Sequence, residues 1–311
     1  MTNLSVRIRE VGPRDGLQNE KKWIETQDKV DWIDQLAETG LSYIELTSFV
    51  HPKWIPALSD ASEVVKGVKK NKNVIFGALV PNERGLDRAL EVGIDEIAVF
   101  LSASETHNRK NINKSIDETF LVLKPVIERA KKSNKPIRGY VSTVFGCPYE
   151  GDVDVNQTRK IAYQLMEAGV EEISFGDTIG VATPNQIEDV IQAISKEVSL
   201  EKMALHPHDT RGTALANVFA AYQLGVRAFD GSVAGLGGCP YAPGASGNVA
   251  TEDLIYLLEG LGAKTGVDLE KLLESAKWIQ RKLGRNLPSH HLQLAMAQDH
   301  REGFVDENTA Y

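Results

Sequence analysis

The sequence predicts a (β/α)8 TIM barrel, an α/β fold of eight parallel strands that alternate with helices, with additional helices at the carboxyl end. Two observations predict it: amphipathic helices that end at glycine and lead directly into a β-rich run, and eight such runs along the 311 residues. Strict alternation of helix and strand favours a parallel sheet, and eight copies favour a closed barrel. An open, doubly wound sheet is the structural alternative.

Four copies of the helix, glycine and strand unit are explicit. A glycine just past a helix adopts the left-handed conformation that other residues avoid, so the helix ends there and a strand can begin. These helix ends and their strands occupy residues 36–40 and 43–46, 89–93 and 97–100, 165–169 and 173–175, and 222–225 and 228–230. Apolar runs at 6–11, 74–80, 137–144 and 203–206 bring the strand count to eight.

The carboxyl end of the chain predicts helices beyond the barrel. Thr251, followed by two acidic residues, is expected to cap the last barrel helix. Apolar residues at helical spacing predict a further helix over 268–284. We therefore expect a single catalytic domain over 1–311, with the barrel over 5–263, a helical appendage over 264–298 and a polar, mobile tail over 299–311.

Composition excludes several classes of protein. The net charge is -8 and no long basic run is present, which argues against a nucleic-acid partner or an anionic membrane surface. No apolar stretch reaches the roughly 18 residues of a membrane span, and no signal-peptide pattern opens the chain. The only two cysteines, Cys147 and Cys239, indicate a reduced compartment rather than a disulfide framework. We expect a cytoplasmic protein.

Ionisable side chains stand at the carboxyl ends of four predicted strands, the face where such barrels build active sites. They are Arg14 and Asp15 after the first strand, Glu45 in the second, Asp177 after the sixth, and His206 and His208 at the seventh. Side chains two positions apart in an extended segment share a face, so both histidines can bind one ion. Pro207 between them favours the extended conformation.

Each of these residues also has a simpler interpretation. A lone His-x-His pair is more often hydrogen-bonded than metal-binding, and Asp15 alone is typical of a turn. Glu45 and Asp177 alone are consistent with carboxylates held by arginines at the barrel mouth. Together, however, these groups would crowd one end of the barrel, where unpaired carboxylates raise one another's pKa. A bound cation would relieve that crowding.

The loop at 235–248 after the eighth strand is too long and glycine-rich for a plain connection. It is expected either to cover the active site or to cradle a phosphate through backbone amides. Cys239 lies in this loop between glycines and Pro240, where an accessible thiol beside a cation can ionise near neutral pH. Cys147 is interpreted as structural.

At this loop the sequence resembles the hydroxymethylglutaryl-CoA lyases. Residues 232–241 read SVAGLGGCPY, and residues 244–253 read GASGNVATED. The resemblance covers nearly the whole chain, including residues 10–20, 44–50, 176–180 and 206–212. Pro207 is unexpected at its position in this family, but it leaves both histidines in place.

The resemblance implies a role for each matching residue. The metal ligands it implies are Asp15, His206, His208 and Asn248. The catalytic set it implies is Arg14 on the substrate, Cys239 as the catalytic thiol, and Glu45, Asp177 and His206. Glu10 and Glu252 are implied as polar neighbours of the site. Gln18, Lys21 and Asn111, the last in the polar run 104–113, are candidate contacts to the acyl-CoA substrate. A homodimer is implied as well.

The implied reaction is the metal-assisted cleavage of (S)-3-hydroxy-3-methylglutaryl-CoA to acetyl-CoA and acetoacetate. Asp177 or His206 would remove the hydroxyl proton, and Cys239 would protonate the acetyl-CoA enolate. Two histidines, a carboxylate, an amide oxygen and two substrate oxygens favour Mg²⁺ or Mn²⁺ over tetrahedral Zn²⁺. No organic cofactor is expected.

Two other functions remain as alternatives. Condensing synthases that join acetyl-CoA to a 2-keto acid look similar around the first strand and the paired histidines, but they lack the cysteine loop. A non-catalytic barrel with a structural metal would close its coordination with protein groups. Mitochondrial relatives carry a leader and a cysteine-bearing extension, so neither import nor thiol-linked regulation is expected here.

Overall fold

The structure is a computed structural model that describes residues 5–238 and 247–308. Its strands form a closed parallel barrel in chain order, and β1 pairs with β8 to complete the ring, which confirms the predicted fold. Each strand coincides with one of the predicted apolar runs. The strands are β1 (Arg7–Glu10), β2 (Tyr43–Ser48), β3 (Ile75–Leu79), β4 (Glu96–Ser102), β5 (Ile137–Ser142), β6 (Glu172–Gly176), β7 (Met203–His206) and β8 (Ala228–Gly231).

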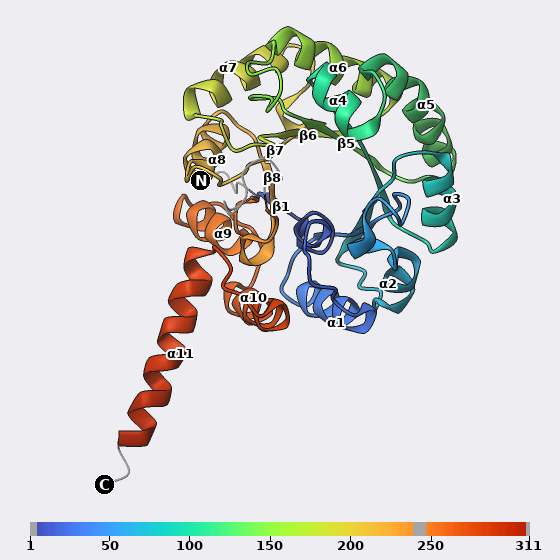
Figure 1. Cartoon of the computed structure of the whole chain (residues 1–311). Helices are drawn as coiled ribbons and strands as arrows, with labels where there is room; N and C mark the ends of the chain where they lie inside the picture. Colours follow the sequence, from blue (N-terminus) through green and yellow to red (C-terminus); the bar gives the residue numbers. More distant parts are fainter. Residues whose placement is uncertain (1–4, 239–246, 309–311) are drawn as a thin grey trace.

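Helices surround this ring of strands (Figure 1). They are α1 (Thr26–Ala37), α2 (Ala61–Gly67), α3 (Glu83–Glu91), α4 (Glu105–Ile112), α5 (Ile116–Lys132), α6 (Val155–Ala168), α7 (Pro184–Ile194), α8 (Ala214–Gln223) and α9 (Thr251–Gly260). Short helical turns are η1 (Gly12–Gly16), η2 (Pro56–Leu58), η3 (Leu200–Lys202) and η4 (Val233–Gly235). Helix α4 lies within the polar run 104–113 and begins after Ser104, whose side chain accepts the amide hydrogen of His107.

Two further helices follow the barrel. Helix α10 (Leu269–Leu283) begins after the capping residue Asp268 and ends at Gly284 in the left-handed conformation, which confirms the helix predicted over 268–284. Helix α11 (His290–Asn308) extends away from the barrel (Figure 1).

Residues 299–308, expected as part of a polar and mobile tail, continue α11 in the structure. The first amides of this helix are satisfied: Asp253 accepts hydrogen bonds from the backbone of His290 and His291, and Ser289 accepts one from Leu292. A capped first turn allows a helix to propagate into polar sequence. Residues 309–311 lie outside the described part of the chain.

The predicted cap of α9 is wrong. Ala250 is the capping residue, and Thr251 is the first helical residue. The hydroxyl of Thr251 donates instead to Oε2 of Glu10 across 2.5 Å. The fully buried Glu10 therefore draws this hydroxyl away from the helix end.

The apolar core lies between the strands and the helices, where large side chains such as Trp32, Leu36 and Phe229 are fully buried. Polar side chains from β1, β5, β6 and β8 meet inside the barrel. Arg9 and Arg138 bind Glu172, and Arg138 also binds Asp230. Contacts among non-adjacent strands can form only across the barrel interior, so this part of the core is a charged layer. It lies beneath the candidate site.

Candidate active site

A cavity of about 840 Å³ opens at the carboxyl ends of the strands. Its polar wall includes Arg14, Asp15, His206 and His208, which come from β1 and β7 and the turns after them. Apolar side chains line the same cavity, among them Leu79, Phe100, Val122 and Leu123, together with the ring of Tyr140. The cavity therefore offers both charged and apolar contacts to one ligand.

Three side chains converge on one point of the polar wall. The ligand atoms of Asp15, His206 and His208 all lie within 4.8 Å of one another. The two Nε2 atoms of the histidines are 3.2 Å apart, and Nε2 of His206 is 3.8 Å from Oδ2 of Asp15. Such a convergence of imidazole nitrogens and a carboxylate oxygen is typical of a metal site.

The amide of Asn248 joins this group. Its Nδ2 donates to Oδ2 of Asp15 across 2.9 Å and to the carbonyl of Leu236 across 3.0 Å. Its Oδ1 is buried and has no hydrogen-bond partner within residues 5–238 and 247–308. Buried polar atoms are normally paired, so this oxygen is available as a ligand. The residues present therefore fit a divalent cation.

Backbone pairing brings Asn248 beside the histidines. Residues 208 and 248 form an isolated antiparallel bridge. The amide of Asp209 donates to the carbonyl of Gly247, and the amide of Val249 donates to the carbonyl of Pro207. Gly237 has a φ of +109°, and a Cβ atom there would lie 2.6 Å from Nδ2 of Asn248. The local backbone thus requires glycine where the eighth loop passes the amide.

Arg14 is held between two carboxylates. Its Nε donates to Oε2 of Glu45 across 2.6 Å, and its Nη1 contacts Oδ1 of Asp15. Burial opposes the charged guanidinium, but Glu45 and Asp15 outweigh burial and hold the pKa of Arg14 above its ordinary value. For Asp15, burial is likewise outweighed by Arg14 and the two histidines, which hold its pKa below the ordinary range. Both groups are charged at neutral pH.

Other pKa shifts in the site arise mainly from burial. Burial raises the pKa of Asp177 to about 6 and that of Glu45 above its ordinary value. Burial, together with the nearby His206, lowers the pKa of His208 to about 3. The ring of His208 is therefore neutral near pH 7, which is the state that binds a metal.

The side chains of Glu10 and Glu252 bind backbone amides of the protein. Glu10 accepts hydrogen bonds from the amides of Gly12 and Val233, and Glu252 accepts one from Ala234. Ala234 has a φ of 63°, a strained conformation that this buried carboxylate supports. Burial raises the pKa of Glu10 to about 8 and that of Glu252 to about 7.

The substrate-contact candidates differ in their placement. Gln18 lines the cavity and donates to Oδ1 of Asp15 across 2.6 Å, and Asn111 of α4 also lines the cavity. Lys21 is exposed and is not among the residues that line the cavity.

The side chain of Asp177 points toward the loop that follows β6. Gly176 and Thr178 line the cavity, whereas the Asp177 carboxylate accepts the amide hydrogens of Val181 and Ala182 across 2.9 and 3.1 Å. This carboxylate orders the loop after β6. Its geometry gives less support to its predicted role as a base.

The two cysteines fall in different parts of the chain. Cys147 is buried, and its Sγ lies 2.9 Å from Oγ of Ser104, as a structural residue would. Cys239 lies outside the described residues.

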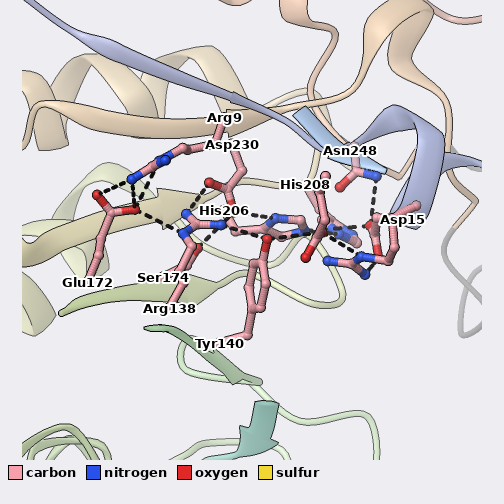
Figure 2. A network of polar contacts seen from close by, with 12 residues as sticks. Arg9, Asp15, Arg138, Tyr140, Glu172, Ser174, His206, His208, Asp230 and Asn248 are labelled. Carbon is pink, nitrogen blue, oxygen red and sulfur yellow. Dashed lines mark hydrogen bonds and ion pairs between the residues drawn. The ribbon is translucent and has the colours of Figure 1, made fainter. Parts of the chain in front are cut away.

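Sequence reasoning missed the charged layer beneath the candidate metal ligands. Figure 2 shows Asp230 between His206 and Arg138, with Glu172 and Arg9 beyond. Nδ1 of His206 lies 2.9 Å from Oδ2 of Asp230. Burial would raise the pKa of Asp230, but Arg138 and the hydrogen bond to His206 hold it well below its usual range. Charged residues inside otherwise apolar strand runs, such as Arg138 and Asp230, were the available signal.

Comparisons with known proteins agree with this geometry. A family model described as HMGL-like matches residues 5–279. The chain is 60% identical to hydroxymethylglutaryl-CoA lyase YngG of Bacillus subtilis, over 93% of this chain and 97% of that protein. The crystal structure of the Bacillus subtilis HMG-CoA lyase superposes with a TM-score of 0.93 at 59% identity, covering 94% of this chain and 98% of that one.

A second solved structure is similar and carries ligands. It is an HMG-CoA lyase from Acinetobacter baumannii in complex with coenzyme A and 3-methylmalate. It superposes with a TM-score of 0.89 at 39% identity and covers 93% of this chain and 95% of that one. Among the described residues, no helix is long and apolar enough to cross a membrane.

Proposed function

Because the chain belongs to the HMGL-like family, we propose that it cleaves (S)-3-hydroxy-3-methylglutaryl-CoA to acetyl-CoA and acetoacetate. The observation that carries the proposal is the convergence of Asp15, His206 and His208 beside Arg14 at the mouth of the cavity. The high identity to a protein named as this lyase supports the choice of substrate.

Bond cleavage in this reaction redistributes the electrons of two bonds, the O–H bond and the bond between carbons 2 and 3, and it moves two protons. The electrons of the O–H bond form the second carbon–oxygen bond of the ketone. The hydroxyl on carbon 3 loses its proton, and its oxygen becomes the ketone of acetoacetate. The bond between carbons 2 and 3 breaks, and its electrons pass into the thioester as the enolate of acetyl-CoA. A proton added to carbon 2 completes acetyl-CoA.

The ligands proposed for the cation are Asp15, His206, His208 and Asn248. When bound there, Mg²⁺ or Mn²⁺ would act as a Lewis acid on oxygens of the substrate. Asp15 and the two histidines already converge within 4.8 Å, so little reorganisation of these side chains is needed.

Arg14 is proposed to stabilise the enolate. Glu45 and Asp15 fix its guanidinium, which lines the cavity, so its hydrogen bonds to a developing oxygen charge need no rearrangement. Charge develops on the thioester oxygen only as the bond breaks, so Arg14 acts mainly in the transition state.

The proton-transfer groups are assigned from the resemblance. Asp177 and His206 are the candidates for the base. Cys239 is the proposed acid, and Gly238, the described residue before it, lines the cavity. Gln18 and Asn111 are proposed contacts to the acyl-CoA. We also propose a cytoplasmic homodimer, with the whole chain as one catalytic domain.

The test is an assay of the purified protein with (S)-3-hydroxy-3-methylglutaryl-CoA, with and without EDTA. We expect equal amounts of acetyl-CoA and acetoacetate, and no turnover after chelation. Absence of cleavage by the metal-loaded protein would refute the proposal. Consumption of acetyl-CoA in the presence of a 2-keto acid would instead support the condensing alternative.

A further inference from the structure

One arginine in the middle of the barrel contacts two separate chains of hydrogen-bonded side chains, called here the two arms. One arm leads to His206 and the other leads to Arg14. Arg138 lies on β5 and is fully buried. Its Nη2 donates to Oδ1 of Asp230 across 2.5 Å, and its Nη1 donates to the hydroxyl of Tyr140 across 2.6 Å. Its Nε donates to Oε1 of Glu172 across 2.9 Å, which anchors it from below. Arg138 is thus a branch point in the network of Figure 2.

The first arm runs through Asp230 to His206. Oδ2 of Asp230 accepts a hydrogen bond from Ser174 across 2.8 Å and lies 2.9 Å from Nδ1 of His206. An ionised carboxylate paired with a guanidinium can only accept hydrogen bonds, so Nδ1 of His206 must carry the hydrogen. The lone pair of that ring then lies on Nε2, the atom that faces Asp15 and His208.

The second arm runs through Tyr140 to Arg14. Because the Tyr140 oxygen accepts from Arg138, its own hydrogen is directed to Oε2 of Glu45, 3.2 Å away. The same Glu45 oxygen accepts from Nε of Arg14. The guanidinium of Arg14 also stands over the Tyr140 ring, 5.2 Å from its centre. This arm therefore fixes the orientation of the planar guanidinium group of Arg14.

We propose that Arg138 is a positioning residue that orients both His206, through Asp230, and Arg14, through Tyr140 and Glu45. Arg138 is not among the residues that line the cavity and acts only through these neighbours. The predicted effect on kcat, through Arg14, rests on the proposed lyase function. The predicted effect on metal affinity, through His206, does not.

The first arm is tested by the Mn²⁺ affinity of Asp230→Asn, measured by the paramagnetic resonance of free Mn²⁺. We expect the affinity to fall by tenfold or more, the usual effect of removing the partner of a ligating histidine. The control is Asp60→Asn, which breaks the buried pair with Lys29 instead. It is expected to lower the melting temperature and leave Mn²⁺ affinity unchanged. Wild-type affinity in Asp230→Asn would overturn this arm.

The second arm is tested by Tyr140→Phe, which keeps the ring and removes the hydroxyl. We expect kcat to fall about three- to tenfold, the effect of one lost hydrogen bond, with KM and Mn²⁺ affinity nearly unchanged. The control is Tyr222→Phe on α8, which removes a buried hydroxyl that has no hydrogen-bond partner among the described residues. Its kcat should equal that of the wild type. An unchanged kcat in Tyr140→Phe would overturn the second arm.

Tyr140 also lines the cavity, so a direct contact with substrate must be distinguished from positioning. If Tyr140 acts through Glu45, the change Tyr140→Phe has no further effect in a Glu45→Gln background. Multiplicative losses in the double variant would show direct contact and overturn the positioning role.

Arg138→Gln should lower both Mn²⁺ affinity and kcat, but it removes the guanidinium that pairs with the buried Asp230 and can prevent folding. The Asp230 and Tyr140 variants therefore decide the inference. A wild-type protein that binds Mn²⁺ without cleaving (S)-3-hydroxy-3-methylglutaryl-CoA would refute the proposed function, and the result for Asp230→Asn would still decide the first arm.

Discussion

Nε of Arg14 donates to Oε2 of Glu45 across 2.6 Å, although the two residues lie 31 positions apart in the chain. Glu45 is fully buried in β2, and Arg14 lies in the turn after β1. The pairing of β1 with β2 brings them together. A buried carboxylate fixes the guanidinium on one side, which leaves the remaining hydrogen-bond donors for the cavity.

This geometry predicts that Arg14→Gln lowers kcat by about 10²-fold with a smaller change in KM, because the lost hydrogen bonds are strongest in the transition state. Arg14→Lys should not restore the rate, since a point charge cannot bind Glu45 and Asp15 as a fork. Steady-state kinetics with the metal-loaded protein measure both. A loss confined to KM would show that Arg14 only binds substrate.

Chelation should abolish cleavage, and Mg²⁺ or Mn²⁺ should restore it. His208→Ala should weaken Mn²⁺ binding by tenfold or more, because it removes one of the convergent nitrogens. His51→Ala serves as the control: this histidine also lines the cavity but does not belong to the cluster, so metal affinity should not change. Full activity in protein that elemental analysis shows to be metal-free would contradict the prediction.

The strands and the convergence of His206 with His208 could be predicted because local patterns determine them. Glycine after each helix and apolar runs locate the strands, and the two-residue spacing of His206 and His208 places both rings on one face. The partners of Arg138 could not be predicted in this way. Its contacts to Asp230 and Tyr140 depend on which strands face each other across the closed barrel.

The orientation of the Asp177 side chain also could not be predicted from the sequence. Its position after β6 is visible in the pattern, but whether its carboxylate faces the cavity or the amides of Val181 and Ala182 depends on the path of the following loop. The capping of α9 was misjudged for a similar reason, because a distant carboxylate, Glu10, competes for the Thr251 hydroxyl.

Cys239→Ala should reduce kcat by about 10²- to 10⁴-fold, the usual effect of removing a positioned acid or base. Mn²⁺ affinity and melting temperature should be unchanged, since the thiol is proposed neither as a ligand nor as a core residue. Thiol alkylation should inactivate the wild type, and saturating substrate should slow this inactivation. Cys147→Ala, which removes the buried thiol, provides the matched control: it should keep the metal affinity and remain sensitive to alkylation. Near-normal turnover of Cys239→Ala would refute the catalytic role.

The buried carboxyl group of Glu10 should make the stability of the folded protein depend on pH. Burial raises its pKa from 4.5 to about 8 in the folded protein. Between these values the folded state retains a proton that the unfolded state has lost, so ionisation favours unfolding. The stabilising contribution of the protonated carboxyl is therefore complete below about pH 4.5 and is lost as the pH rises through 8.

Glu10→Gln should remove this dependence. The glutamine oxygen can still accept from the amides of Gly12 and Val233, and its amide can donate to Thr251, but the side chain never ionises. Melting temperatures of metal-free wild type and variant should be compared from pH 5 to 9. The melting temperature of the variant minus that of the wild type should rise as the pH approaches 8 and then level off. All other titrating groups are common to both proteins, so a difference that stays constant with pH would mean that Glu10 does not titrate in this window.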